Sequence, residues 1–350
     1  MSDSRKVEDE VDAAASRSAA ARLHELLAST RLWHAVTAAA NLGLPDALRG
    51  GARSPADVAD ELGLDETALA RLLGVLAAAG VLAEREDGRF ELAEVGQLLR
   101  ADAPASLRDW VRYMGRPYVQ EAWANLDHSI RTGENTFAWL HGESVWQWRT
   151  HEPAERELFD AAMAVQTSAA HGVVEAFDFG RLGTLVDVGG GSGVLLASIL
   201  AAHPLLRGTL FDQPSVVAAD ATRRTLAAAG VADRCQVVGG SFFEAVPARA
   251  GGYLLKSILH DWDEVDARRI LGTVRRDARP DSLVLIVERI VGGANSDLEG
   301  KLSDLNMLVM PGGRERSEVE WRSLLAASGF RLGEVRPLPR PFNLLVAELD

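Results

Sequence analysis

The stretch Leu185-Val-Asp-Val-Gly-Gly-Gly-Ser-Gly193 decides the fold, because a short apolar segment runs directly into a glycine-rich turn. Glycine lets the backbone approach a ligand closely, and it exposes N–H groups at the start of the following helix. A dinucleotide-binding fingerprint would need Gly or Ala at position 194, where this chain has Val194. The glycines that define the spacing are Gly189, Gly191 and Gly193, so the turn predicts a different ligand.

Acidic and aromatic residues at three successive segment ends indicate what that ligand is. Asp187 precedes the glycines, where it would repel a pyrophosphate and favour a ligand with positive charge. Asp212 ends the next apolar segment, about 20 residues after the glycines, where an acid accepts hydrogen bonds from two ribose hydroxyls. The third segment leads to Ser241 and Phe242, a hydroxyl for the edge of a purine and a ring to stack on it. Together they predict a nucleoside ligand.

From residue 182 onward, short apolar segments alternate with stretches of helical periodicity. The expected parallel strands are 184–188, 208–211, 235–238, 252–256 and 283–288, and a terminal hairpin is expected at 332–336 and 342–348. This alternation predicts an α/β domain with a doubly wound, mostly parallel seven-stranded sheet. Ligands bind such sheets at the carboxyl ends of the strands, where the glycine turn and the acids lie.

The N-terminal part is expected to be mainly helical after a loose, charged tail at 1–17. Residues 20–48 carry apolar side chains at helical spacing, which suits either an interface with a second subunit or packing within the chain. Residues 54–100 predict a winged-helix module, in which Ser54 and Asp65 cap two helices and Asp87-Gly88 turns a hairpin.

A winged helix raises the alternative of a DNA-binding regulator, and charge decides against it. Arg71 is the single basic residue of the second helix, and residues 54–100 hold ten acids and four arginines. This segment has a negative net charge, whereas contacts with DNA phosphates need positively charged side chains. The module is therefore interpreted as structural.

Composition limits the partners further. The 350 residues carry a formal net charge of −13, which disfavours nucleic acid and anionic membranes as partners. The single cysteine, Cys235, excludes an internal disulfide, and no apolar run reaches the roughly 18 residues of a membrane span. The sequence start lacks a signal-peptide pattern, so we expect a cytoplasmic protein.

His260 is the candidate general base. It follows the apolar segment 252–256, and a phenol needs a base within hydrogen-bond reach before it can attack a methyl donor. Two carboxylates, Glu288 and Glu315, could hold the ring in one tautomer. We expect the glycine turn and this imidazole to face one shared cavity.

The acids next to His260 suggest a hard metal ion as an alternative. They are Asp261, Asp263, Glu264 and Asp266. Residues 263–266 are better explained as the capped start of a helix, whose dipole favours acids. No metal is therefore expected.

These motifs together resemble the small-molecule S-adenosylmethionine-dependent O-methyltransferases of plant caffeate type and their bacterial antibiotic-pathway relatives. The resemblance covers nearly the whole chain. It rests on the stretch 185–193 and, in order, on Phe211-Asp-Gln-Pro214, Leu255-Lys-Ser-Ile-Leu-His-Asp-Trp262, Ile286-Val-Glu-Arg289 and Pro311-Gly-Gly-Arg-Glu-Arg316. Plant members carry Asp-Met where this chain has Ser241-Phe242.

The resemblance implies a class I methyltransferase fold, S-adenosylmethionine as cofactor, and methylation of a hydroxyl on a small aromatic secondary metabolite. It implies a homodimer formed by the N-terminal helices and places Glu288 and Glu315 beside His260. The expected cofactor residues are Asp187, Gly189, Gly191, Gly193, Asp212, Gln213, Ser241, Phe242 and Lys256. The expected substrate-pocket residues, from a segment rich in aromatics and from the later Met307, are Met114, Trp123, Trp146, Phe159, Met163 and Met307.

The implied domains are a tail at 1–17, a dimerisation and winged-helix region at 18–105, a substrate-pocket segment at 106–178 and a catalytic domain at 179–350. Two further alternatives share this fold. An N- or C-methyltransferase could use the same base. A divergent hydroxylase or decarboxylase would be marked by loss of the base, and His260 is present.

Overall fold

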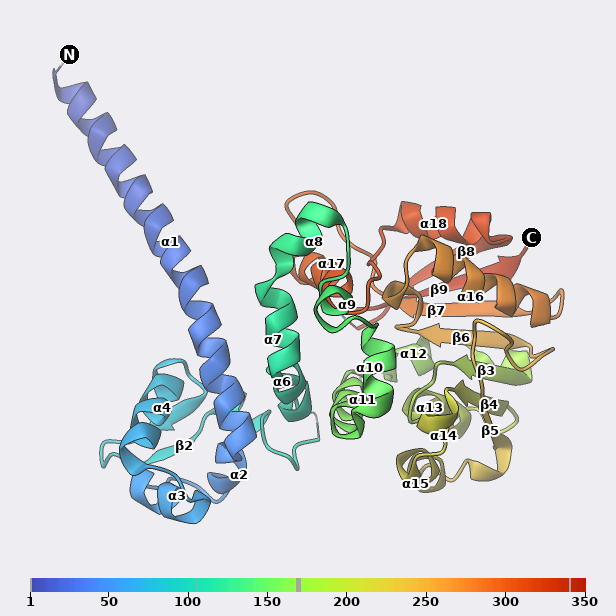
Figure 1. Cartoon of the computed structure of the whole chain (residues 1–350), viewed down its shortest axis with the longest axis horizontal. Coiled ribbons are helices and arrows are strands. Elements are labelled where there is room, and N and C mark those ends of the chain that lie inside the picture. Colours follow the sequence, from blue (N-terminus) through green and yellow to red (C-terminus); the bar gives the residue numbers. More distant parts are fainter. Residues whose placement is uncertain (1, 105, 168–170, 340) are drawn as a thin grey trace. The chain divides into compact units, whose positions relative to one another are not determined.

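The structure is a computed structural model that describes residues 2–104, 106–167, 171–339 and 341–350 (Figure 1). The chain forms two compact units, Met1–Arg116 and Pro117–Asp350. Within the described ranges, no helix combines the length and the apolar character that crossing a membrane requires.

The first unit is mainly helical. Its elements are α1 (Ser2–Leu42), α2 (Leu44–Ala47), α3 (Pro55–Leu62), α4 (Glu66–Ala78), β1 (Leu82–Glu84), β2 (Phe90–Leu92), α5 (Glu94–Gln97) and α6 (Arg108–Met114). The predicted order of helix, turn, helix and hairpin is present. Ser54 and Asp65 accept capping hydrogen bonds at the starts of α3 and α4, and β1 pairs with β2 in antiparallel fashion.

Two boundaries in this unit differ from the sequence-based expectation. The backbone of residues 2–17 continues α1, where a loose tail was expected. The first 42 residues contain neither Gly nor Pro and are rich in alanine, a strong helix former. The segment 106–178 is divided, because α6 packs against α1 and stays with the first unit.

The second unit contains the predicted seven-stranded sheet, in the order β5-β4-β3-β6-β7-β9-β8. Its strands are β3 (Thr184–Val188), β4 (Arg207–Asp212), β5 (Cys235–Gly239), β6 (Gly252–Lys256), β7 (Leu283–Glu288), β8 (Phe330–Pro337) and β9 (Asn343–Leu349). The first five are parallel, and β9 is antiparallel to both of its neighbours. The predicted fold class is confirmed. The strand order reverses between β3 and β6, which is where such sheets bind ligands.

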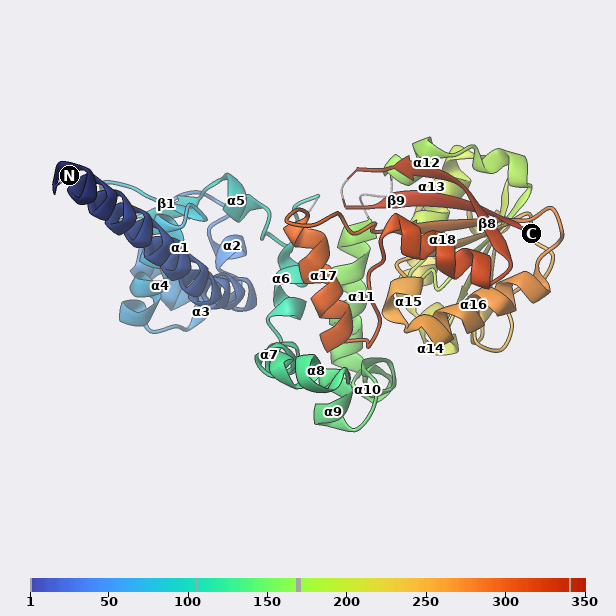
Figure 2. The same cartoon turned by 90° about the horizontal axis from the view of Figure 1, so that it is seen from above.

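Helices cover both faces of this sheet (Figure 2). One face packs against α12 (His171–Ala176), α13 (Val194–Ala202) and α15 (Asp220–Ala228), in an apolar core that includes Leu196 and Leu210. The other face packs against α16 (Glu264–Asp277) and α18 (Glu318–Ala327), around Ile270 and Trp321. Both layers hold the carboxyl ends of the strands rigidly in place. The short α14 (Pro214–Val217) follows β4.

The remaining helices form a separate group in the second unit. They are α7 (Pro117–Ala124), α8 (Leu126–Thr132), α9 (Thr136–His141), α10 (Val145–His151), α11 (Pro153–Thr167) and α17 (Leu298–Val309). Although α17 is distant in sequence, it packs against α7, α8 and α9. Trp123 Nε1 donates to Asn306 Oδ1 at 3.1 Å, and Asn135 Nδ2 donates to the Leu308 carbonyl at 2.7 Å. These two bonds fasten α17 beside the aromatic segment.

Candidate active site

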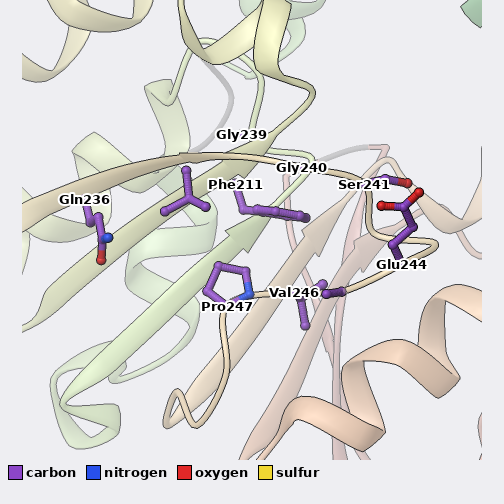
Figure 3. A pocket seen from close by; sticks show the side chains of 10 residues that line it. Phe211, Gln236, Gly239, Gly240, Ser241, Glu244, Val246 and Pro247 are labelled. Atoms are coloured by element: carbon purple, nitrogen blue, oxygen red, sulfur yellow. The ribbon is translucent and has the colours of Figure 1, made fainter.

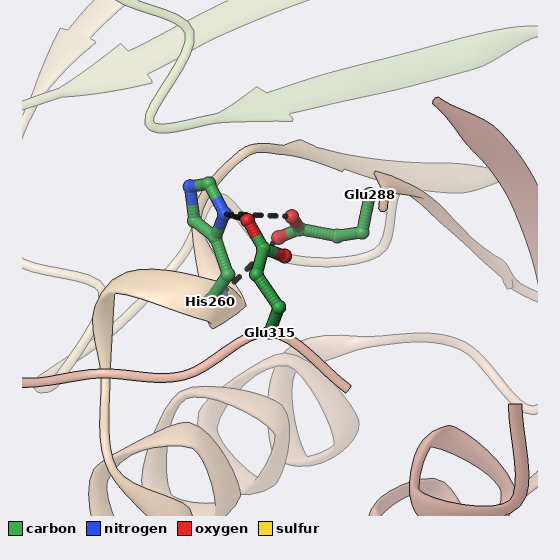
Figure 4. Close-up of side chains that lie close together, drawn as sticks. All are labelled: His260, Glu288 and Glu315. Atoms are coloured by element: carbon green, nitrogen blue, oxygen red, sulfur yellow. Dashed lines mark hydrogen bonds and ion pairs between the residues drawn. The ribbon is translucent and has the colours of Figure 1, made fainter. Parts of the chain in front are cut away.

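His260 lies on a 3-10 turn, η4 (Leu259–Asp261), just beyond the end of β6. Glu288 is the last residue of β7, the neighbour of β6, and Glu315 lies in the loop between α17 and α18. Figure 4 shows both carboxylates beside the same edge of the imidazole. The ring atom Nδ1 is 3.0 Å from Glu315 Oε1 and 3.4 Å from Glu288 Oε2. The structure therefore brings the three predicted residues together.

Glu288 also holds the backbone that carries the base. Its Oε1 accepts hydrogen bonds from the N–H groups of Ile258, Leu259 and His260, at 3.0, 3.0 and 3.3 Å. The preceding Ser257 has φ 53°, in the left-handed region, and the N–H groups after it converge on one point. Such a concave set of N–H groups binds an anion. The Glu288 side chain is fully buried. One of its carboxylate oxygens binds the N–H groups of the turn, and the other faces the imidazole ring.

Glu315 is oriented from α17. Ser303 Oγ donates to Glu315 Oε1 at 2.7 Å, and the Glu315 N–H donates to Asp304 Oδ1 at 2.8 Å. Burial works against the charged form of Glu315, but the His260 ring and the Ser303 hydroxyl hold its pKa below the usual value. Burial raises the pKa of Glu288, whose contact with the ring is longer. Glu315 therefore makes the closer contact with Nδ1, and the ring and Ser303 favour its charged form.

The charges around the imidazole favour its protonated form. Burial by itself lowers the pKa of His260, but the carboxylates of Glu288, Asp261 and Glu315 outweigh it and raise the pKa to about 10. Asp261 Oδ1 is 3.5 Å from Nε2, on the side of the ring away from the glutamates. Burial raises the pKa of Asp261 to about 7, against the pull of His260. Nδ1 is thus engaged, and Nε2 is the atom left for proton exchange.

The glycine turn has the backbone geometry that only glycine adopts without strain. Gly189, Gly191 and Gly193 have φ of 72°, 57° and 79°. The turn is tied to the end of β4, because Asp212 accepts hydrogen bonds from the Gly191 N–H at 2.9 Å and the Gln213 N–H at 2.6 Å. Asp212 is thereby placed beside the turn, at the carboxyl edge of the sheet.

The surroundings of the Asp187 carboxylate show whether a cationic cofactor fits this site. Its side chain is buried and its Oδ2 has no hydrogen-bond partner. Burial and the nearby Asp212 raise the pKa of Asp187 to about 7, while Lys256 lowers it. A buried carboxylate oxygen without a donor is costly unless a cation or donor approaches it. A ligand with a cationic group and a ribose therefore fits the residues present.

The glycine turn and the base turn lie against each other. A Cβ placed on Gly189 would overlap with the side chain of Ile258, the first residue of the turn closed by Glu288, and would lie 3.8 Å from the Phe242 ring. Lys256, at the end of β6, is half-buried, and its charge acts on both Asp187 and Glu288. The turn after β3 and the turn after β6 therefore touch where the strand order of the sheet reverses.

The two residues expected near a purine lie in different surroundings. Ser241 is one of the residues that line a pocket of about 440 Å³ beside the edge strand β5, with Phe211, Glu244 and Pro247 (Figure 3). Phe242 lies by Gly189 instead, with its ring centre 5.9 Å from that of Trp262. Ser241 Oγ accepts a hydrogen bond from the Phe243 N–H at 3.3 Å, so part of its bonding capacity is used within the loop.

Several expected substrate-pocket residues are grouped near the base. Trp146 and Phe159 meet edge to face at 5.7 Å between ring centres, and Trp146 lies 6.3 Å from Trp262, which follows His260 by two positions. Met163 is on α11, one turn after Phe159. Met307 is buried on α17, next to the Asn306 that binds Trp123. Met114 belongs to α6 in the first unit.

The acids weighed as a metal site have other partners. Asp263 caps α16 through the Asp266 N–H at 2.8 Å, as expected for a helix start. Glu264 and Asp266 pair with arginines one turn along the same helix. Among the described residues, the acids and histidine close enough to share an ion are His260, Glu288 and Glu315. Their facing atoms are joined by the hydrogen bond between Nδ1 and Glu315 and by the longer ion pair between Nδ1 and Glu288.

Sequence reasoning missed the roles of three residues of this site. Arg316 was quoted in a motif without a role, yet its buried guanidinium binds the backbone on both sides of the base. Ser303 was not singled out, because nothing in the sequence around a serine inside a helix indicates that its hydroxyl donates to Glu315. Asp261 was weighed only as a metal ligand, and it lies beside Nε2.

Comparison with known proteins agrees with this geometry. Residues 20–102 match an O-methyltransferase dimerisation domain, and residues 123–331 match an O-methyltransferase domain. The O-demethylpuromycin-O-methyltransferase of Streptomyces alboniger is 42% identical over 88% of this chain and 84% of its own length.

Two solved structures are also similar. The mitomycin 7-O-methyltransferase MmcR has a TM-score of 0.90 and 36% identity, over 96% of this chain and 99% of its own. The O-methyltransferase NcsB1 of neocarzinostatin biosynthesis has a TM-score of 0.80 and 34% identity, over 91% and 96%. It was crystallised with S-adenosylmethionine and 2-hydroxy-5-methyl naphthoic acid.

Proposed function

The chain belongs to the S-adenosylmethionine-dependent O-methyltransferase family, and from this premise we propose that it methylates a hydroxyl of a small aromatic molecule, with His260 as general base. The observation that carries the proposal is the His260 ring, whose Nδ1 is bound between two buried carboxylates while Nε2 faces away from them. A fixed tautomer with one available nitrogen is what a base needs.

In the proposed reaction, the acceptor oxygen would take the methyl group from the cofactor, whose methyl–sulfur bond would break and leave its electron pair on the sulfur, and the acceptor proton would move to Nε2 of His260. Glu315 and Glu288 stabilise the imidazolium that results, since both face Nδ1. The proton then leaves to solvent with the product. Positioned acid–base groups of this kind contribute about 10² to 10⁴ in rate.

The cofactor supplies an electrophilic methyl group on a positively charged sulfur. We propose that Asp187 and Lys256 meet its charged amino-acid portion, and that Asp212 and Gln213 accept and donate hydrogen bonds at its ribose. Gly189, Gly191 and Gly193 let the backbone come close to it. We propose that Ser241 and Phe242 contact the purine ring of the cofactor. The unpartnered Asp187 Oδ2 supports this assignment.

The acceptor is proposed to be flat and aromatic, in keeping with the naphthoic acid bound by NcsB1. Stacking surfaces of suitable size come from Trp146 and Phe159, in contact near the base. Met163 and Met307 would adapt to an irregular ligand outline, and Trp123 is bound to Asn306, the residue before Met307. Met114, on α6 of the first unit, stays a prediction from the sequence.

We further propose a cytoplasmic homodimer joined through the N-terminal helices. Support comes from the matched dimerisation domain and from α1, where Leu23, Leu26 and Leu27 are exposed. In this arrangement residues 18–105 pair two copies, residues 106–178 contribute substrate contacts and residues 179–350 carry the cofactor.

The test is mass spectrometry of the purified protein with S-adenosylmethionine and a panel of phenols, in which a product gains one methyl group. We expect His260→Ala to lower turnover by about 10² or more while S-adenosylhomocysteine still binds, as measured by calorimetry. The matched control is His203→Ala, a half-buried histidine beside Asp178 in the same unit. Undiminished methylation by His260→Ala would remove the general-base assignment.

A further inference from the structure

Arg316 is the most deeply buried cation of the site that the proposed reaction does not use. It ends the motif at 311–316, and only 1% of the residue is exposed. Burial lowers the pKa of this arginine, and Glu288 and Glu264 act in the opposite direction. Its Nη1 and Nη2 atoms have defined acceptors, whereas its buried Nε has no hydrogen-bond partner in the structure.

The acceptors of Arg316 are carbonyl groups on both sides of the base. Nη1 donates to the Leu259 carbonyl at 2.9 Å, and Nη2 donates to the Trp262 carbonyl at 3.2 Å. These two residues flank His260 and Asp261. The guanidinium also lies over the Trp321 ring, at 5.2 Å from its centre, and 3.8 Å from Glu264. The planar fork of an arginine suits two acceptors at a fixed spacing.

The rest of the same loop packs on the same turn. The Arg314 N–H donates to the His260 carbonyl at 2.8 Å. A Cβ on Gly313 would overlap with the backbone of His260 and Asp261, so the loop approaches as closely as glycine allows. On the other side of the turn, Glu288 Oε1 accepts the three N–H groups of residues 258–260. The turn is therefore bound by a carboxylate through its N–H groups and by a guanidinium through its carbonyls.

We propose that Arg316 is a positioning residue for His260, because its guanidinium fixes the backbone at both ends of the turn that carries the imidazole. The inference rests on the proposed role of His260 as base. A displacement of a catalytic group by about 1 Å costs about 10² in rate. Arg316 itself contacts neither the ring nor the reacting atoms.

The test compares Arg316→Lys and Arg316→Gln with Arg314→Gln. The control removes an exposed side chain paired with Glu320 and keeps the backbone bond to His260. The rate of a single turnover is measured at saturating S-adenosylmethionine and acceptor, together with the affinity for S-adenosylhomocysteine. We expect both Arg316 variants to lose at least about 30-fold in rate with affinity changed less than about 3-fold, and the control to keep its rate.

Combination with His260→Ala separates positioning from general loss of structure. If Arg316 acts through the imidazole, adding Arg316→Lys to His260→Ala should not lower the single-turnover rate any further. A loss of less than about 3-fold in both single variants, or an equal loss in the His260→Ala background, would overturn the proposal.

A spectroscopic readout keeps the proposal testable without turnover. In protein with ¹⁵N-labelled histidine and bound S-adenosylhomocysteine, we expect Arg316→Lys to shift or broaden the His260 ring signals, assigned by their absence in His260→Ala, and to spare the other histidines. Gly313→Ala should have the same effect, since its methyl group pushes the loop from the turn. Unchanged His260 signals in both variants would contradict the inference, whatever the enzyme proves to methylate.

Discussion

The two nitrogen atoms of the His260 imidazole have different acidic neighbours. Glu315 and Glu288 bind Nδ1, at 3.0 and 3.4 Å. Asp261 lies beside Nε2, at 3.5 Å. Three carboxyl groups therefore surround one ring, and this local excess of acidic groups favours the protonated imidazole.

This excess predicts a pH dependence. The carboxylates overcome burial and raise the pKa of His260 to about 10, so the ring is protonated below that pH in the ligand-free protein. Only the neutral ring accepts a proton, so the rate should rise with pH until the ring is neutral. A bound sulfonium repels the imidazolium and should lower its pKa, whereas the uncharged sulfur of S-adenosylhomocysteine should not.

The measurement is an NMR titration of His260 in three states: free, with S-adenosylmethionine and with S-adenosylhomocysteine. The pKa should be lowest with the sulfonium compound, and the acidic limb of the rate profile should follow that value. Equal pKa values with both compounds would show that the charge of the sulfur does not reach the ring.

At the scale of elements, the site is formed where β3 and β6 meet and the turns after them touch. Gly189 is the point of contact, because its position leaves no space for a side chain next to Ile258. The same glycine has φ 72°, so two separate constraints act on one residue. A change at Gly189 should therefore disturb the cofactor turn and the base turn together.

Substitution by alanine should separate these two constraints. Gly183 has φ 69° and ψ −43° and open space around its Cβ position, so Gly183→Ala carries backbone strain without an overlap. Gly189→Ala carries backbone strain and, in addition, the overlap with Ile258. We expect S-adenosylhomocysteine affinity, measured by calorimetry, to fall at least about 10-fold in Gly189→Ala and to stay near the wild-type value in Gly183→Ala. Equal effects would mean that the contact with Ile258 is easily relieved.

At the scale of the whole molecule, α1 leaves apolar surface uncovered. Leu23, Leu26 and Leu27 are 58%, 61% and 59% exposed, on a helix that belongs in part to the matched dimerisation domain. Exposed leucines in a cluster at helical spacing are typical of a surface that pairs with another protein. A second copy of this chain is the partner proposed above.

The combined change Leu23→Glu and Leu27→Glu should separate the two copies, because the side chains share one face of α1 and charges there would have to be buried. Light scattering after size-exclusion chromatography at low micromolar concentration should then give the mass of one chain. Glu25→Gln, on the same helix, is the control and should keep the mass of two. A dimer in the doubly substituted protein would place the interface elsewhere.

The sequence alone determined where the strands lie along the chain, the winged-helix caps and the residues at each strand end, because short-range hydrogen bonding and apolar periodicity act within about ten residues. The sequence named Glu288 and Glu315 as partners of the His260 ring, but only the tertiary structure shows which atoms they bind and that Arg316 and Ser303 belong to the same network. Glu288, Glu315 and Arg316 bind the His260 turn across 28, 55 and 57 positions of the chain. Contacts over such distances depend on how the sheet and its loops pack, and local patterns do not encode them. Local sequence patterns therefore gave no sign that Arg316 is buried against the backbone of the turn that carries His260.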